Sequence, residues 1–168
     1  MRTLLILCAA AALQAQNNPL SADLKQNYAM QKQLLLAAAE RMPAADYAFK
    51  AAPSTGTFAA RVAHVADAQF MICGAVKGEA QKPVAASKTS KADILSALKG
   101  SFDYCDGVYN GMTDATSTQP VKIFGESQSK LSALWGNLGH DQEIYGYIAV
   151  YLRLKGLTPP SSDRQPPK

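Results

Sequence analysis

Helical periodicity is the feature that most constrains the fold of this chain. In four long segments, apolar residues recur at intervals of three and four, which is the spacing that lines one face of an α-helix. No segment alternates apolar and polar residues for long enough to predict a sheet. The sequence therefore predicts an all-α fold, because four helices with one apolar face each bury those faces best as a four-helix bundle.

Residues that start and stop helices set the limits of these segments. Ser21 is the expected N-cap of the first helix, which ends before Pro43, and Ser90 opens the third helix in a sequence like a capping box. Gly156 stops the fourth helix just before two prolines. The predicted helices cover residues 21–41, 57–78, 90–111 and 126–155.

Residues 1–15 have the composition of a cleaved signal peptide. Arg2 gives a positive start, a short apolar run follows, and Ala15 precedes a polar segment. The apolar run is shorter than the roughly 20 residues that a membrane span needs, so we expect no stable membrane anchor. We predict export, to the periplasm or outside the cell, of one domain over residues 16–160 with a disordered proline-rich tail over 161–168.

The charge of the chain is mild and evenly spread. The formal charge of +4 falls to +3 when Arg2 leaves with the leader. Basic residues stand singly, with no arginine cluster and no interleaving of basic and aromatic residues. The sequence therefore predicts no nucleic-acid partner.

Cysteine usage agrees with export. The mature chain keeps only Cys73 and Cys105, an even number for a compartment that would be oxidising. We predict that they pair across two successive helices, which would stabilise the fold by about 3 to 4 kcal/mol through loop closure. The alternative is that both are small buried core residues.

His64 and His140 are the only histidines, and each lies within a predicted helix. A third histidine four residues after His140 would place two imidazoles one helical turn apart, and His64 would then complete an open metal site. The residue at that position is Ile144. The chain therefore offers two nitrogen ligands and an apolar side chain where a third ligand would stand.

The sequence around both histidines carries a family resemblance. The matching stretches are Thr57-Phe58, Val62-Ala63-His64-Val65-Ala66-Asp67, His140-Asp141-Gln142-Glu143-Ile144-Tyr145-Gly146 and Tyr151-Leu152-Arg153. Together they resemble the DinB superfamily, also called the DinB/YfiT-like metalloenzymes, over nearly the whole mature chain. The chain is most similar to a secreted branch in which the two helix cysteines also recur.

The resemblance implies a DinB-like four-helix bundle with a metal site. Three histidines of that family, one from the second helix and two from the fourth, hold a divalent metal such as nickel or zinc with open positions for water or substrate. On this chain they correspond to His64, His140 and position 144, where Ile144 has no lone pair to donate. The family's homodimers imply a possible homodimer here.

Two carboxylates offer a substitute for the missing imidazole. Glu143 lies three residues after His140, and Asp67 lies three residues after His64, so both can approach the site from the same helices. Two histidines and a carboxylate form a legitimate ligand set for zinc or iron. Alternatively, Asp67 orients His64 as a hydrogen-bond acceptor, or both histidines are simply hydrogen-bonded polar groups of the bundle.

Two functions remain open at this point. By resemblance, the chain is an exported metal-dependent hydrolase or thiol transferase, with His64 and His140 as ligands. The alternative is a non-catalytic module that has lost the metal and binds a small molecule or a protein. Ile144 makes the pocket more apolar, which favours a small hydrophobic ligand over an activated water.

Overall fold

The structure is a computed structural model that describes residues 18–163. The predicted signal peptide over residues 1–15 lies outside the described residues, as does the end of the predicted tail over 164–168.

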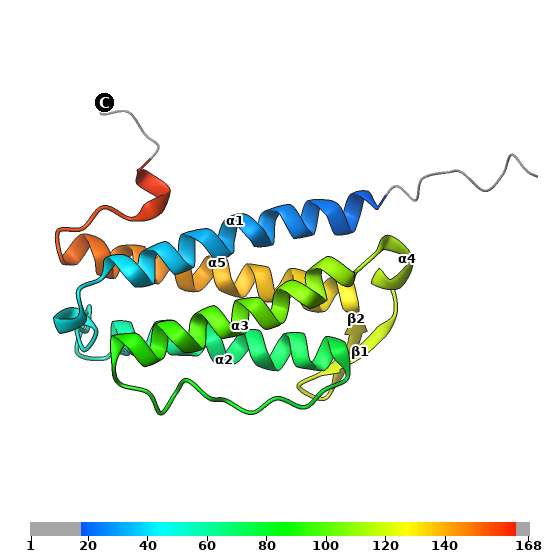
Figure 1. The fold of residues 1–168 in the computed structure, drawn as a ribbon, viewed down its shortest axis with the longest axis horizontal. Coiled ribbons are helices and arrows are strands. Elements are labelled where there is room, and N and C mark those ends of the chain that lie inside the picture. The colour runs from blue at the N-terminus through cyan, green and yellow to red at the C-terminus, as the bar shows by residue number, and fades with distance from the viewer. Residues whose placement is uncertain (1–17, 164–168) are drawn as a thin grey trace, which may run out of the picture.

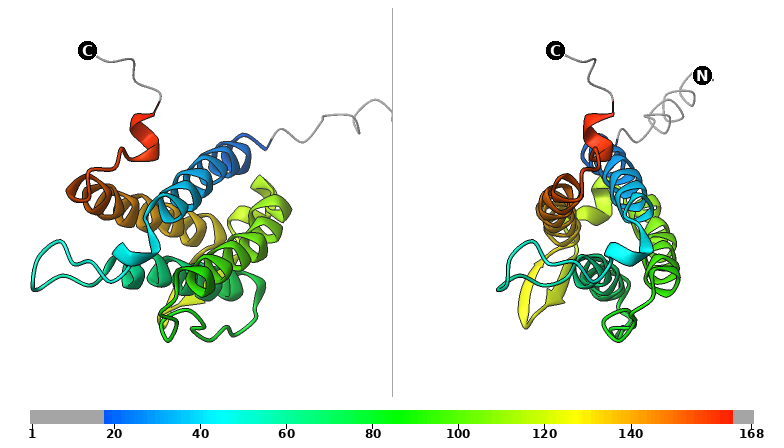
Figure 2. Two further views of the ribbon diagram at one scale, coloured as in Figure 1. Left: turned by 60° about the vertical axis from the view of Figure 1, so that its left-hand side comes forward. Right: turned by 90° about the vertical axis from the view of Figure 1, so that its left-hand side faces the viewer.

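Four long helices of the described chain form a bundle (Figure 1). They are α1 (Pro19–Arg41), α2 (Phe58–Lys77), α3 (Lys91–Gly111) and α5 (Lys130–Leu154). Helix α2 packs against α3 and α5, and α1 packs against the same two helices from the other side. The end-on view in Figure 2 shows this closed arrangement. The predicted all-α four-helix bundle is confirmed.

Side chains cap three of these helices as helix chemistry requires. The side chains of Thr57, Ser90 and Ser129 each accept a hydrogen bond from the backbone N–H three residues later. After the C-terminus of α5, Gly156 has a φ of 72°, in the left-handed region expected for a residue that follows a helix. The predicted start of the third helix and the stop at Gly156 are confirmed.

The start of α1 differs from the prediction. The helix begins at Pro19 with Asn18 as N-cap, so Ser21 lies in the first turn. Pro19 suits the first helical position because it has no N–H to leave unpaired. Asp114 supplies the acceptor that we expected of Ser21: its Oδ1 accepts the Ser21 N–H at 2.8 Å and its Oδ2 accepts the Leu20 N–H at 3.1 Å.

A β-hairpin precedes α5, where the sequence predicted no strand and a helix from about Glu126. Strand β1 (Pro120–Ile123) pairs with β2 (Glu126–Ser129) in antiparallel register, with Ile123 opposite Glu126. The strands are four residues each, too short for a period of two to be recognised. Helix α5 starts only at Lys130 because Ser129 caps it.

Three short helices complete the connections. They are η1 (Ala44–Asp46), α4 (Asp114–Ser117) and η2 (Pro160–Ser162). The last one corrects the predicted boundary of the disordered tail, because residues 161–163 are ordered. Asp163 forms an ion pair with Arg41 at 2.7 Å, and the Ser161 N–H donates to the Tyr145 hydroxyl at 2.8 Å. These contacts hold η2 against α1 and α5.

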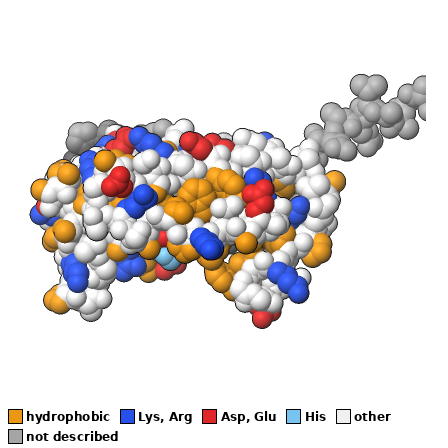
Figure 3. Space-filling model, turned by 60° about the horizontal axis from the view of Figure 1, so that its bottom comes forward, with side chains coloured by type: hydrophobic (Ala, Val, Ile, Leu, Met, Phe, Trp, Pro, Cys, Tyr) orange, Lys and Arg blue, Asp and Glu red, His pale blue; other side chains and the backbone are white. Residues whose placement is uncertain are grey.

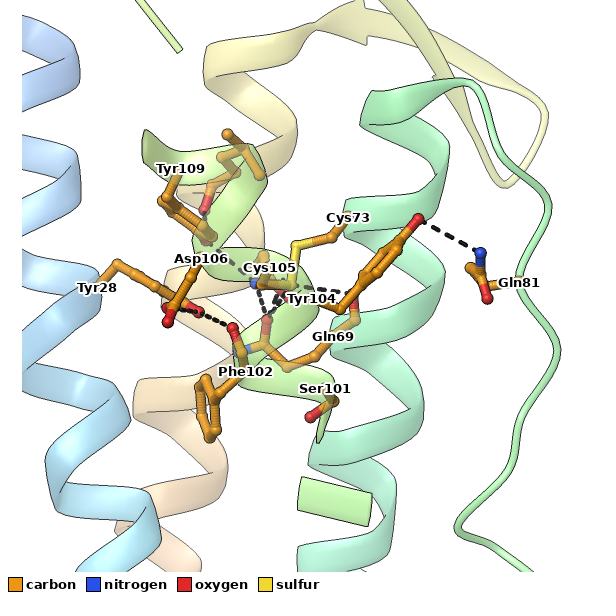
Figure 4. Close-up of a disulfide and its surroundings, with 12 residues drawn as sticks. Tyr28, Gln69, Cys73, Gln81, Ser101, Phe102, Tyr104, Cys105, Asp106 and Tyr109 are labelled. Carbon is orange, nitrogen blue, oxygen red and sulfur yellow. Dashed lines mark hydrogen bonds between the residues drawn. A yellow bond between two sulfur atoms is a disulfide. The ribbon is translucent and has the colours of Figure 1, made fainter. Parts of the chain in front are cut away.

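The core lies between the four helices and is mostly aliphatic and aromatic. Its fully buried large side chains include Phe58, Phe102, Tyr109 and Leu134. Cys73 on α2 and Cys105 on α3 form a disulfide with their Cα atoms 5.5 Å apart, in place of two free core thiols (Figure 4).

None of the helices within residues 18–163 combines the length and hydrophobicity of a membrane span.

Candidate functional site

The structure brings the two histidines together on one face of the bundle. His64 projects from α2 and His140 from α5, and their Nε2 atoms are 2.9 Å apart. The two rings meet edge to face, with centroids 4.9 Å apart. This contact is a hydrogen bond, so one Nε2 carries a proton and the other accepts it. At least the accepting ring is therefore neutral.

Electrostatics favour a neutral His64. The His64 side chain is largely exposed, but partial burial still lowers its pKa below the usual range, and the nearby His140 and Arg61 lower it further. A neutral imidazole is the form that binds metals and exchanges hydrogen bonds with uncharged ligands. The pair therefore presents nitrogen lone pairs and N–H groups rather than a fixed positive charge.

The distance between the two nitrogens suits two adjacent positions on one metal ion. Two imidazole nitrogens bound at about 2.0 to 2.1 Å lie about 2.9 Å apart at a right angle and about 3.4 Å apart in a tetrahedron. The observed 2.9 Å matches the right-angle case. Both nitrogens can serve as metal ligands only when the proton they share has left, because a protonated ring nitrogen has no lone pair to donate.

No third protein ligand stands beside them. Ile144, at the position of the family's third histidine, is 4% exposed and packs in the hydrophobic core. Among the described residues, no three His, Cys, Asp or Glu side chains are grouped so that they could hold a metal ion. The residues present therefore do not fit the three-ligand site that the resemblance implies.

Asp67 is bonded to backbone rather than to a histidine. Its Oδ1 accepts the N–H groups of Val84 and Ala85 at 2.7 and 2.8 Å, and its Oδ2 accepts the N–H of Ala86 at 3.0 Å. The carboxylate ties the linker between α2 and α3 to the middle of α2. Its oxygens already have donors, so Asp67 has little capacity left for a metal ion.

Glu143 is also bonded elsewhere. Its Oε1 accepts the Tyr147 hydroxyl at 2.7 Å, one turn further along α5. The Tyr147 ring in turn lies under the guanidinium of Arg61, whose central carbon is 5.3 Å from the ring centroid. Tyr147 therefore holds both Glu143 and Arg61 at the surface beside the histidine pair.

A buried carboxyl lies directly behind His140. Asp141 has no exposed surface, and burial raises its pKa to about 6 against the opposing influence of His140. Its Oδ1 is 3.8 Å from Nδ1 of His140, and neither atom has a hydrogen-bond partner within the described chain. The Asp141 carboxyl is therefore the acidic group nearest to the inner nitrogen of His140.

Gln69 connects this carboxyl to the disulfide, and Figure 4 shows Gln69 beside the two cysteines. Its Nε2 donates to Oδ2 of Asp141, and its Oε1 accepts Nδ2 of Asn137 at 2.8 Å. The same Oε1 is 2.8 Å from Sγ of Cys105. Tyr109 extends the network, because its hydroxyl accepts Nδ2 of Asn137 at 3.1 Å and donates to the Leu134 carbonyl at 2.9 Å.

Sequence reasoning missed this buried network. Gln69, Asn137 and Asp141 are fully buried, and they stand at helix positions that the apolar pattern assigns to the core. That mismatch between polar residues and core positions was the available signal, because buried polar groups need hydrogen-bond partners. The partners could not be identified from sequence because they come from different helices.

A cleft opens beside His64. It has a volume of about 540 Å³ and lies between the first half of α2, the loop before α2 and the linker that Asp67 holds. Its lining is dominated by small side chains: Ala48, Thr57, Ala59, Ala60, Ala63, Ala86 and Thr89, with Lys88 as a basic group. Figure 3 shows a hollowed face of the molecule with histidine surface at its margin. The volume is typical of small-molecule sites.

Comparisons with known proteins agree with the fold. The family model of the DinB superfamily matches residues 27–148. A DinB-like protein from Bacillus cereus superposes with a TM-score of 0.73 at 17% identity, over 83% of this chain and 95% of that chain. A DinB-like protein from Bacillus subtilis gives 0.66 at 15% identity, over 81% and 93%. A search of curated proteins finds no match.

Proposed function

Because this chain belongs to the DinB superfamily, we propose that it is an exported member that has lost the three-ligand metal site and binds a small, largely apolar molecule beside His64. The observation that carries the proposal is Ile144. A side chain that cannot coordinate a metal is packed into the core at the position of the third ligand. A binding role needs only the cleft, whereas the family's metal chemistry needs the missing imidazole.

The properties of the cleft support this type of ligand. Alanine side chains leave room without offering hydrogen bonds, so a ligand that fits among them is largely apolar. His64 adds a group that can donate or accept one hydrogen bond. The expected ligand is therefore a small, largely apolar molecule with one polar atom, for which indole is a suitable probe.

Export rests on separate observations. Residues 1–15 have signal-peptide composition. The Cys73–Cys105 disulfide persists most readily in an oxidising compartment, such as the periplasm or the medium. The two features support the same cellular location.

Elemental analysis tests the loss of the metal site. The wild type and an Ile144→His variant are produced through the secretory route and analysed for nickel and zinc. We expect stoichiometric metal only in the variant, because it regains the third imidazole. Ile144→Gln serves as the control for a polar residue at this core position. Stoichiometric metal in the wild type would contradict the proposal.

Binding of indole tests the cleft. We expect indole to shift the NMR signals of His64 in the wild type. Ala60 is exposed and lines the cleft, so Ala60→Leu fills the space without overpacking the core and abolishes the shift. Ala22→Leu places the same side chain on exposed α1 and leaves binding unchanged. An undisturbed His64 in the wild type at saturating indole would count against the proposal.

A second function is favoured by one measurement, the 2.9 Å between the histidine nitrogens. His64 and His140 would hold a divalent ion such as nickel or zinc at two positions, with the others left to water or substrate. Such an ion acts as a Lewis acid in the hydrolases and thiol transferases that the resemblance suggests. Equal and stoichiometric metal in the wild type and in Ile144→His would favour this function.

A further inference from the structure

A second cleft lies away from the histidines, between the hairpin and the end of α2. It has a volume of about 870 Å³. Met71 on α2 lines one side, and Val121 and Ile123 of β1 line the other, together with Phe124 at the tip of the hairpin. Figure 2 shows the hairpin standing off the bundle beside α2 and α5. The walls that face each other across this cleft are largely apolar.

Phe124 combines two unfavourable features. Its side chain is 78% exposed, and its backbone has a φ of 53°, in the left-handed region that bulky residues avoid. Gly125 follows with a φ of 87°, so the two residues form a hairpin turn of the kind that strongly prefers Asn-Gly or Asp-Gly. Phenylalanine has no role in forming this turn, but it places an aromatic ring at the mouth of the cleft.

The opposite wall is fixed in place. Helix α2 ends at Gly78 with a φ of 80°, and the Glu79 N–H then bonds back to the Gly74 carbonyl at 2.8 Å. A Cβ on Gly74 would lie 2.5 Å from Cγ of Gln81 and 2.7 Å from the carbonyl oxygen of Glu79. The segment after α2 therefore packs directly onto the helix, and the cleft is bounded on this side by rigid structure.

The charge of the lining is positive. The one acidic side chain, Glu79, is already paired with Lys77 at 3.1 Å and accepts the Tyr104 hydroxyl at 2.6 Å. Lys130 and Lys122 also line the cleft, and neither forms an ion pair with a carboxylate of the described chain. Lys130 is half-buried. Lys122 is exposed, because its side chain lies on the face of β1 opposite the buried side chains of Val121 and Ile123. Lys130 is therefore the less exposed of the two cations.

We propose that this cleft binds a medium-chain alkyl carboxylate. The alkyl chain lies between Met71 and the hairpin, Phe124 covers it, and Lys130 pairs with the carboxylate. Apolar walls with an unpaired cation at the edge complement a ligand of this shape and charge. The site is independent of the histidine pair and of the cleft beside it.

Calorimetric titration with decanoate, below the concentration at which it forms micelles, tests this proposal on the mature protein. Decanamide is the uncharged probe of the same length. We expect decanoate to bind at least about tenfold more tightly than decanamide, because only the carboxylate pairs with lysine. Lys130→Gln should remove most of this difference, and Lys122→Gln should have a smaller effect. Lys99→Gln, on α3, is the control for loss of one surface charge.

Phe124→Asn gives the sharpest test, because stability and binding should change in opposite directions. Asn-Gly suits the turn, so the melting temperature should rise. Loss of the ring should weaken both decanoate and decanamide by about tenfold. His64→Ala should leave both affinities unchanged, which separates this site from the cleft beside the histidines.

Several results would overturn the proposal. One is equal affinity for decanoate and decanamide in the wild type. Another is an unchanged affinity in Phe124→Asn or in Lys130→Gln. A third is binding to phosphatidylglycerol vesicles without binding to free decanoate, which would indicate a membrane surface as the partner instead.

Discussion

Asp141 shows how one buried residue makes stability depend on pH. Its carboxyl has no exposed surface and receives a single side-chain hydrogen bond, from Gln69. Burial penalises the ionised form more strongly than the neighbouring His140 favours it, so the pKa rises from 3.8 to about 6. The native state thus holds this proton more tightly than the unfolded chain does.

This shift predicts that Asp141 destabilises the fold as pH rises through about 6. Below the unfolded pKa both states are protonated, whereas above the native pKa the ionised carboxylate remains buried, at a cost of about 2 to 3 kcal/mol. The free energy of unfolding of the wild type, relative to Asp141→Asn, should therefore fall between about pH 4 and about pH 7. Urea denaturation of both proteins across this range measures the difference. A difference that stays flat or rises would contradict the predicted sign.

The two histidines could be predicted at the residue scale, and their surroundings could not. The pattern around His64 and His140 indicated that the two rings lie close together, and their Nε2 atoms are 2.9 Å apart. Glu143 follows His140 by three residues and Asp67 follows His64 by three, so both carboxylates were expected beside the two rings. Their actual partners are a tyrosine hydroxyl and three backbone N–H groups, which spacing along a helix does not reveal.

At the scale of elements, Asp67 fixes the linker between α2 and α3. It accepts three consecutive N–H groups of a segment that has no regular structure of its own. The Asp67 carboxylate thereby provides the acceptors for these backbone N–H groups, which a helix or a sheet would otherwise provide. The linker forms one wall of the cleft beside His64, so its order also shapes that cleft.

Asp67→Ala should loosen the linker. We expect a loss of about 1 to 2 kcal/mol in stability, because partly buried N–H groups lose their acceptor. Hydrogen exchange at residues 84–86 should accelerate, while the core of α2 keeps its protection. Asp23→Ala, at an exposed position of α1, controls for the lost charge. Unchanged exchange at residues 84–86 would show that the linker is held by other contacts.

The disulfide should contribute more than any surface ion pair. It closes a loop between residues 32 positions apart, so its removal in Cys73→Ser/Cys105→Ser should cost about 3 to 4 kcal/mol through chain entropy. Urea denaturation of the oxidised wild type and of the double variant measures this loss. A loss below about 1 kcal/mol would mean that the unfolded chain already keeps α2 and α3 together.

Long elements could be predicted from the sequence, and short ones could not. Each long helix repeats its apolar pattern over five or more turns, so the period is unambiguous. The hairpin contributes only Val121 and Ile123 to the buried side of β1, which is too little pattern to recognise. Its Phe-Gly turn also lacks the usual Asn-Gly signal, so the four residues of β2 were assigned to the following helix.

At the scale of the whole molecule, the core and the histidine pair are largely separate. The fully buried residues lie between the four helices, whereas His64 is exposed and His140 is only partly buried. We therefore expect the bundle to fold without a metal ion, unlike small domains whose structure forms around one.

This separation predicts that His64→Ala/His140→Ala folds normally. We expect its melting temperature to stay within a few degrees of the wild type, because substitutions outside the core rarely change stability by more than about 0.5 kcal/mol. Circular dichroism during heating measures this temperature, and Leu138→Ala, in the core, provides the contrast of a large loss. A drop in the double variant as large as that of Leu138→Ala would place the histidine pair among the residues that hold the bundle together.

The Asp114 carboxylate at the start of α1 has a consequence for the order in which the chain folds. It bonds to the N–H groups of Leu20 and Ser21 from 94 and 93 positions further along the sequence. On the ribosome, α1 is synthesised first. The backbone N–H groups of its first turn can therefore bond to Asp114 only after most of the chain has been made. For the export that we propose, such late completion of α1 suits passage through a translocation channel, which requires an incompletely folded chain.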